Sequence, residues 1–331
     1  MKKQLRTALL SAVFGAALAS PVLAADKIAV VVKSLGNGFF DAVHQGAQEA
    51  AKELGNVEII YTGPAQSTAE GQIEIINALI SQKVAAIVIS ANDPDALVPS
   101  LKRAKDRGIK VLSFDSGVRK DGRMMHLNPS GNALIGEKLV KLTQQAIGDS
   151  GEIAILSATA QAMNQNVWIA EAKKVLARPE YQGLKLVGVV YGDNQSDKSY
   201  REAQGLFKSH PNLKAIIAPT TIAIAAAAKA VQDEGKIGSV YVTGLGLPSE
   251  MAGHVKSGAV KSFAIWNPID LGYSSVHAAS QFISGKLSGK PGERVSLGRV
   301  GTVTLNANGE ADMSEPFTYD ARNVGKFAKI F

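Results

Sequence analysis

KIAVVVKSLGNGFFDAVHQGAQEAA, residues 27–51, encodes a strand, a turn and a helix in immediate succession. The run 28–32 is apolar throughout and rich in β-branched residues, as a strand buried on both faces requires. A glycine-rich turn follows at 36–38. Apolar residues then recur on one helical stripe up to Leu54, and Gly55 provides a stop signal. The segment therefore predicts one strand–turn–helix unit of an α/β fold.

The same alternation continues along the rest of the chain. Further strands are expected at 57–61, 85–90, 110–114, 152–157, 184–190, 214–218, 239–244, 260–265 and near 295–305. Helices are expected from a capping box at 67–70, from Pro94 to Gly108, and at 132–147, 163–177, 197–209, 221–233, 249–257 and 270–285. Alternating strands and helices indicate parallel sheets covered on both faces. About ten strands exceed one comfortable open sheet, so we expect an α/β fold of two doubly wound parallel-sheet lobes.

Composition excludes several classes of protein. The chain has 331 residues, 46% hydrophobic and 20% charged, which is enough to bury a core and argues against disorder. It has no cysteine, so it has no disulfide framework, thiolate zinc site or cysteine nucleophile.

The first 24 residues have the layout of a secretory signal peptide. A basic start precedes an apolar run of about a dozen residues and small residues at a cleavage site ending in Ala24. The alternative is a membrane anchor, but the run is shorter than the ~20 residues that a span needs. Without a cysteine there is no lipid attachment point, so we expect a periplasmic protein.

The net charge does not indicate a nucleic-acid partner. Three of the 36 Lys and Arg residues lie in 1–24, and the remaining 33 against 29 acidic residues leave +4, with no basic block.

Candidate binding residues follow the predicted strands, because parallel sheets bind ligands at the carboxyl ends of their strands. They are mostly neutral and polar: Lys33, Asn92, Asp93, Asp115, Asn128, residues 159–165, Thr220, Thr221, residues 244–246 and Asn267. Such groups can hydrogen-bond hydroxyls from several directions, and Phe39 and Phe40 could cover an apolar sugar face. The alternative is that these polar residues only cap helices.

No motif supports an enzyme. The histidines show no metal-binding spacing, and no phosphate loop, dinucleotide fingerprint or nucleophile elbow occurs. Asp93 and Asp95 flank Pro94 at a predicted helix start, where acids complement the dipole. Trp168 and Trp266 are either core residues or ligand platforms, and Trp266 has the better case because it follows a strand. We therefore predict no catalytic residues, metal or cofactor.

At this point the sequence resembles the periplasmic type I sugar-binding proteins of ABC importers. The resemblance rests on residues 27–51, on SANDPDALVPSLKRAKDRGIKVLSFDS (90–116), on AIIAPTTIAIAAAAKA (215–230) and on YVTGLGLPSEM (241–251). EGQIEIINALISQ (70–82) and Lys33 after the first strand are similar to the branch of rhamnose-binding proteins and autoinducer-2 (Lsr) receptors. GNGFF and HLNPS (126–130) look closest to the rhamnose-binding proteins.

The resemblance implies where the ligand is held. It places Lys33, Asp115 and Gln165 on the ligand by hydrogen bonds, the Phe pair along it, and the 219–221 backbone against it. Asn164 and Asn267 would serve further hydroxyls. The expected ligand-binding residues are Lys33, Asn37, Phe39, Phe40, Asp115, Asn164, Gln165, Pro219, Thr221 and Asn267.

The chain departs from its relatives at positions that affect the choice of ligand. Asn164 stands where the autoinducer-2 receptors have Asp, and Thr221 where they have Ala. Gly246 and Gln165 replace the Asp and Arg of ribose binders. We therefore expect L-rhamnose, whose methyl group suits the Phe pair. The alternatives are autoinducer-2, another sugar-like signal, or another pentose or deoxyhexose.

The family's architecture implies discontinuous lobes. Three hinge crossings are expected near 128–130, 264–267 and 300–303. The N-terminal lobe would then comprise 25–129 and 267–300, and the C-terminal lobe 130–266 and 301–331. The resemblance also implies a monomer that closes on its sugar and docks on an inner-membrane ABC permease.

Overall fold

The quoted segment forms β1 (Asp26–Val31) and α1 (Gly38–Leu54) in the computed structural model, which describes residues 25–331. Asn37 caps α1 by accepting a hydrogen bond from the Phe39 amide, and Gly55 ends the helix in the left-handed conformation. The signal peptide predicted for 1–24 lies outside the described residues. Within 25–331, no helix has the length and apolarity needed to cross a membrane.

The apolar run after Lys27 contributes side chains to two hydrophobic cores. For this reason apolar and polar residues do not alternate in it. Ile28, Val30 and Val32 belong to the core beneath α1. Ala29 and Val31 point to the opposite face and join the second core. A strand covered on both faces needs apolar side chains at every position.

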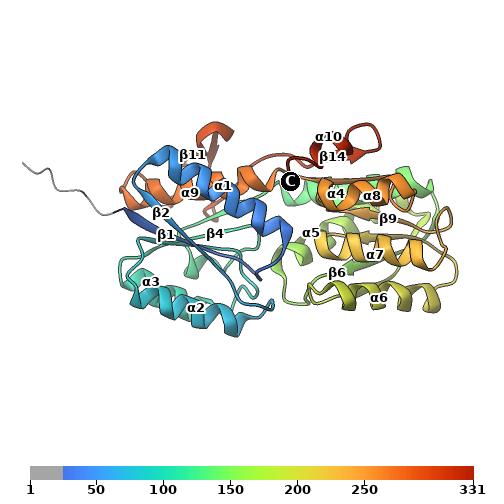
Figure 1. Ribbon diagram of the computed structural model, residues 1–331, viewed down its shortest axis with the longest axis horizontal. Coiled ribbons are helices and arrows are strands. Elements are labelled where there is room, and N and C mark those ends of the chain that lie inside the picture. The colour runs from blue at the N-terminus through green and yellow to red at the C-terminus, as the bar shows by residue number, and fades with distance from the viewer. Residues whose placement is uncertain (1–24) are drawn as a thin grey trace, which may run out of the picture.

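The first lobe is a six-stranded parallel sheet with strand order β13-β5-β4-β3-β1-β2. Its other strands are β2 (Val57–Thr62), β3 (Ala86–Ile89), β4 (Lys110–Phe114), β5 (Met125–Asn128) and β13 (Glu310–Asp312). In Figure 1, α1 and α9 (Pro268–Ile283) lie on one side of this sheet, and α2 (Ala69–Ser81) and α3 (Val98–Asp106) lie on the other.

The second lobe contains a four-stranded parallel sheet in the order β7-β6-β8-β9. Its strands are β6 (Gly151–Ser157), β7 (Leu184–Tyr191), β8 (Leu213–Ala218) and β9 (Tyr241–Gly244). Its helices are α4 (Asn132–Ile147), α5 (Met163–Leu176), α6 (Ser196–Ser209), α7 (Thr221–Asp233) and α8 (Pro248–Ser257). Strand β10 (Ser262–Ile265) bridges to the end of β9 and pairs with β14 (Phe317–Asp320), and α10 (Val324–Phe327) packs on α8. The predicted two-lobed α/β fold is confirmed.

The third crossing differs from its predicted position. The chain passes between the sheets after β5, after β10, and a third time only after β13, whose residues pair with β5 in the first lobe. The expected crossing at 300–303 is therefore wrong. Residues 294–304 instead form a hairpin of β11 (Arg294–Ser296) and β12 (Thr302–Thr304). Residues 301–312 thus belong with the N-terminal lobe and not, as expected, with the C-terminal lobe. Three strands, β5, β13 and β14, were not predicted from the sequence.

The starts of α2 and α3 differ slightly from the prediction. Helix α3 begins at Val98, four residues after Pro94, because the Asp93 carboxylate holds the preceding turn by accepting from the Asp95 and Ala96 amides. The cap of α2 is Thr68 and not Ser67, since the Thr68 hydroxyl accepts from the Gly71 amide.

Acid is expected to destabilise the fold through His126. This side chain is buried on β5 with Nδ1 2.9 Å from the Ser113 hydroxyl, and burial, reinforced by the positive charge of Arg123, lowers its pKa to about 3. In the unfolded chain a histidine binds its proton near pH 6.5. The stability that neutral His126 contributes is therefore complete above that pH and declines as the pH falls from there toward 3. The loss is about 2 kcal/mol at pH 5.

Urea unfolding near neutral pH and near pH 5 measures this effect. The wild type should lose about 2 kcal/mol more stability on acidification than His126→Gln does. Equal losses in the two proteins would contradict the assignment.

Candidate functional site

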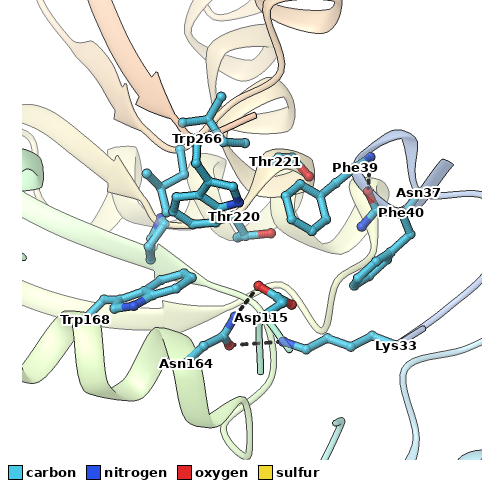
Figure 2. Close-up of a pocket in the computed structure, with 13 residues that line it drawn as sticks. Lys33, Asn37, Phe39, Phe40, Asp115, Asn164, Trp168, Thr220, Thr221 and Trp266 are labelled. Atoms are coloured by element: carbon cyan, nitrogen blue, oxygen red, sulfur yellow. Dashed lines mark hydrogen bonds between the residues drawn. The ribbon is translucent and has the colours of Figure 1, made fainter. Parts of the chain in front are cut away.

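A cavity lies between the two lobes and is lined by residues of both. It sits at the carboxyl ends of β1, β4, β8 and β10. Its lining residues are Lys33, Asn37, Phe39, Phe40, Asp115, Asn164, Trp168, Pro219, Thr220, Thr221, Leu245, Ile265 and Trp266. Figure 2 shows a polar side formed by Lys33, Asp115 and Asn164. Phe39 and Trp266 lie across from it, and with Phe40 and Trp168 at the two ends they form the aromatic side.

The polar side joins both lobes through one amide. Asn164, on α5 of the second lobe, donates from Nδ2 to Asp115 Oδ1 at 3.0 Å and accepts from Lys33 Nζ at 3.1 Å. Lys33 and Asp115 follow β1 and β4 of the first lobe. All three side chains are 5–6% exposed. The polar side is therefore complete only while the lobes are together.

Burial acts on the two charged groups in opposite directions. It lowers the pKa of Lys33 and raises the pKa of Asp115, while the attraction between the two charges opposes both shifts. The carboxylate is also stabilised by the Ser90 hydroxyl, which donates to Oδ2 at 2.7 Å. Each further hydrogen bond to these groups would stabilise their charged forms, and ligand hydroxyls are suited to supply them.

The backbone of Asp115 adopts a left-handed conformation, with φ of 55°. This conformation is uncommon for residues with a side chain, although Asp tolerates it better than most. The Asp115 amide donates to the Leu127 carbonyl on β5 at 3.2 Å, which holds the bend. The bend comes at the first residue after β4, where the carboxylate meets Ser90 and Asn164.

The aromatic side is a chain of edge-to-face contacts. Phe40 contacts Phe39 at 5.2 Å between ring centroids, Phe39 contacts Trp266 at 6.3 Å, and Trp266 contacts Trp168 at 5.5 Å. These rings come from α1, from the crossing after β10 and from α5. Rings that project from both lobes and a crossing form a wall suited to the C–H faces of a sugar.

Helix N-termini add backbone donors to the same space. Helices α1, α5 and α7 all begin at the cavity, next to Asn37, Asn164 and Thr220. The residues that precede α5 and α7 make no side-chain capping bond. In α5 the Gln165 amide donates instead to Asn164 Oδ1 at 2.9 Å.

Gln72 and Asn92 do not line the cavity but hold the backbone next to it by hydrogen bonds. The side-chain amide of Gln72 is fully buried. Its nitrogen donates to the carbonyls of Val32 and Ser90, and its oxygen accepts from the backbone N–H of Asn92. Asn92 in turn donates to the Lys33 carbonyl at 2.9 Å. This network ties the end of β1 to the end of β3 and holds the Lys33 backbone. Asn128 is engaged elsewhere, donating to Asp312 on β13.

Eight of the ten expected residues line the cavity, and two do not. Asn267 caps α9 by accepting from the Ile269 amide and donates to Asp270. It lines a separate cavity at the crossings, together with Trp266. Gln165 is buried beside Asn164, and its side-chain oxygen has no hydrogen-bond partner within residues 25–331.

Five lining residues were not among the expected ligand-binding residues: Trp168, Thr220, Leu245, Ile265 and Trp266. For Thr220 and Trp266 the sequence carried a signal, since both follow predicted strands. Trp168 lies in the second turn of α5, one helical turn beyond Asn164, so the same helix face presents both. Leu245 and Ile265 are apolar and look like ordinary core residues in the sequence.

Comparison with known proteins supports the resemblance seen in the sequence. Residues 28–287 match a family model described as periplasmic binding protein domain. The chain is 31% identical over 231 residues to the D-ribose/D-allose-binding protein of Pseudomonas aeruginosa, covering 66% of this chain and 70% of that protein.

Two solved structures show the same fold. An ABC transporter solute-binding protein from Clostridium phytofermentas with bound L-rhamnose is 36% identical, with a TM-score of 0.89, and the match covers 93% of this chain and 99% of that one. LsrB from Clostridium saccharobutylicum in complex with AI-2 has a TM-score of 0.85 over 91% of this chain and 99% of its own, but only 22% identity, so it shows the shared fold alone.

The family match spans most of the chain and includes every residue that lines the cavity. The predicted resemblance to periplasmic binding proteins is thereby confirmed, as is the prediction that the protein is not an enzyme. The chain belongs to the periplasmic binding protein family and is a solute-binding protein.

Proposed function

We propose that this protein is the sugar-binding component of an ABC importer and that its ligand is L-rhamnose. The observation that carries the proposal is the two-sided cavity between the lobes, with buried Lys33, Asp115 and Asn164 facing a wall of four aromatic rings. The rhamnose-bound relative, 36% identical over nearly its whole length, supports the choice of sugar.

The chemistry of the cavity matches a 6-deoxyhexose. An ammonium donates, a carboxylate accepts and an amide does both, so the polar side can bind several hydroxyls of one sugar. The aromatic side offers apolar surface for the C–H face of the ring and for the methyl group that replaces the sixth hydroxyl. Lys33, Asp115 and Asn164 bind the hydroxyls, while Phe39 and Phe40 pack against the sugar.

Binding in such a site is coupled to closure. Asn164 lies on the second lobe and contacts two side chains of the first, so a sugar between them joins the lobes in the same way. Closure removes water and strengthens the hydrogen bonds to the sugar. The closed, loaded protein then docks on an inner-membrane permease and releases its sugar there.

D-ribose or D-allose is the second candidate, because the Pseudomonas aeruginosa relative is named for both sugars. Its identity is lower and its match shorter than those of the rhamnose-bound structure. Autoinducer-2 is a weaker third candidate, since the similarity to LsrB is one of fold.

Calorimetric titration of the ligand-stripped protein tests the proposal. The panel consists of L-rhamnose, L-mannose, L-lyxose, D-ribose, D-allose and autoinducer-2. L-mannose carries a hydroxyl on C6 that L-rhamnose lacks, and L-lyxose lacks the C6 methyl group altogether. Both sugars therefore test the apolar contact of the methyl group. Each of these two sugars should bind at least about tenfold more weakly than L-rhamnose, since one buried methyl group contributes ~1–3 kcal/mol of binding free energy.

The outcomes separate the parts of the proposal. Tighter binding of D-ribose or D-allose than of L-rhamnose would overturn the choice of sugar and leave the receptor role standing. Binding of none of the sugars would overturn the carbohydrate assignment.

A further inference from the structure

The chain contains two tryptophans, Trp168 and Trp266, and both line the ligand cavity. Their rings lie 5.5 Å apart and both side chains are buried. They differ in the hydrogen bonding of the indole N–H. Trp168 donates from Nε1 to the Asn132 side chain at 2.9 Å. Trp266 Nε1 is fully buried and has no hydrogen-bond partner among residues 25–331.

An indole N–H buried without an acceptor is unusual. Such a group loses its hydrogen bond to water and gains none in return, so buried indoles normally find a partner. Trp266 is only 3% exposed, and no bulk water reaches its nitrogen. Among residues 25–331 the group is therefore a donor without an acceptor.

The position of the ring indicates where the missing acceptor belongs. Figure 2 shows the nitrogen on the side of the Trp266 ring turned toward Phe39 and the threonine pair, within the group of lining residues. The ring is held by Phe39 and Trp168 at its edges. Its backbone lies between β10 and the first turn of α9, where Asn267 forms the cap. Such a ring cannot readily turn to another acceptor.

We infer that the Trp266 indole N–H donates a hydrogen bond to an oxygen of the bound sugar and thereby selects sugars that present an acceptor beside the aromatic wall. This inference rests on the proposed function and adds a specificity-determining donor to it. A ligand lacking that oxygen leaves the donor buried and unpaired, so the site discriminates against it. The aromatic side of the cavity therefore contributes one directional contact in addition to apolar surface.

The two indoles allow a direct test by ¹H–¹⁵N NMR. A uniformly labelled sample gives two indole resonances, which Trp168→Phe and Trp266→Phe assign by elimination. On saturation with L-rhamnose, or with D-ribose if that sugar binds instead, the Trp266 indole proton should move downfield and exchange more slowly with solvent. The Trp168 proton already has an acceptor, so its exchange rate should change less.

Titration of single-deoxy analogues of the same sugar identifies the oxygen. We expect Trp266→Phe to bind the parent sugar about tenfold more weakly, in line with the loss of one buried hydrogen bond. One deoxy analogue should bind the wild type and Trp168→Phe more weakly than the parent sugar binds them. The same analogue should bind Trp266→Phe as tightly as the parent sugar does. Such non-additivity reports a direct contact. Trp168→Phe is the matched control, since it makes the same ring truncation in the same cavity.

Failure of this inference is distinguishable from failure of the proposed function. If a sugar binds but the Trp266 indole proton keeps its shift and exchange rate, and every analogue loses affinity additively with Trp266→Phe, the hydrogen bond does not exist. If no sugar binds, the proposed function fails and this inference with it.

Discussion

Asp115→Ala is expected to reduce sugar affinity on the order of a hundredfold or more, the largest effect that we predict for binding. The carboxylate is the buried acceptor of the polar side and already binds Ser90 and Asn164. Its removal takes away an acceptor for the ligand and leaves the buried Lys33 ammonium without its counter-charge. Truncating one member of such a pair costs 2–5 kcal/mol in comparable interfaces.

Calorimetry on the stripped protein measures this loss, with thermal unfolding as a check that the variant is folded. Asp95→Asn is the matched control. It also removes a carboxylate that follows a first-lobe strand, but Asp95 is exposed and paired with Arg119. It should bind the sugar like the wild type. An Asp115→Ala protein that binds within about threefold of wild type would show that the sugar lies elsewhere.

Gly46→Ala is expected to cause the largest loss of stability. Helices α1 and α9 cross in close contact, and a Cβ at Gly46 would overlap the Ile269 carbonyl oxygen of α9. Gly272 of α9 meets the Val43 carbonyl of α1 in the same way. Since backbone atoms cannot move aside as a flexible side chain can, the helices must separate. We expect a loss of about 3 kcal/mol or more, at the upper end of overpacking effects.

Denaturant unfolding of Gly46→Ala beside Gly205→Ala tests this prediction. Gly205 lies within α6, and a Cβ there would meet no atom within 4 Å. Its replacement should stabilise the protein by up to about 1 kcal/mol through helix propensity. If Gly46→Ala were as stable as the wild type, the close crossing of α1 and α9 would be wrong.

Most of the local structure follows from short-range patterns in the sequence. The all-apolar run before Lys33 predicts a strand covered on both faces, and Asn37 and Gly55 mark the ends of the helix that follows. These signals are readable because propensity, capping and hydrophobic period act over a few residues. The clustering of strand-end residues was also predictable, because parallel strands place their carboxyl ends at one edge of the sheet.

The sequence did not show which of two adjacent residues lines the cavity, because neighbouring side chains point in different directions. Adjacent side chains in an extended segment point to opposite sides, so Trp266 lines the cavity while Asn267 caps α9. On α5, Asn164 reaches Lys33 and Asp115, whereas Gln165 lies about 100° around the helix and misses the cavity. Strand-end position alone does not show which of two adjacent polar residues faces a ligand.

The amino-acid order thus specifies the α/β alternation, nearly every helix and the edge of the sheets where the cavity lies, because each depends on neighbours in the chain. The third crossing required the folded molecule. Strand β13 is three residues long and carries no apolar pattern, and its place beside β5 is supported by the Arg123–Glu310 ion pair, joined across 187 positions. The unpaired indole of Trp266 is likewise visible only in three dimensions, because it depends on no other segment of residues 25–331 bringing an acceptor to it.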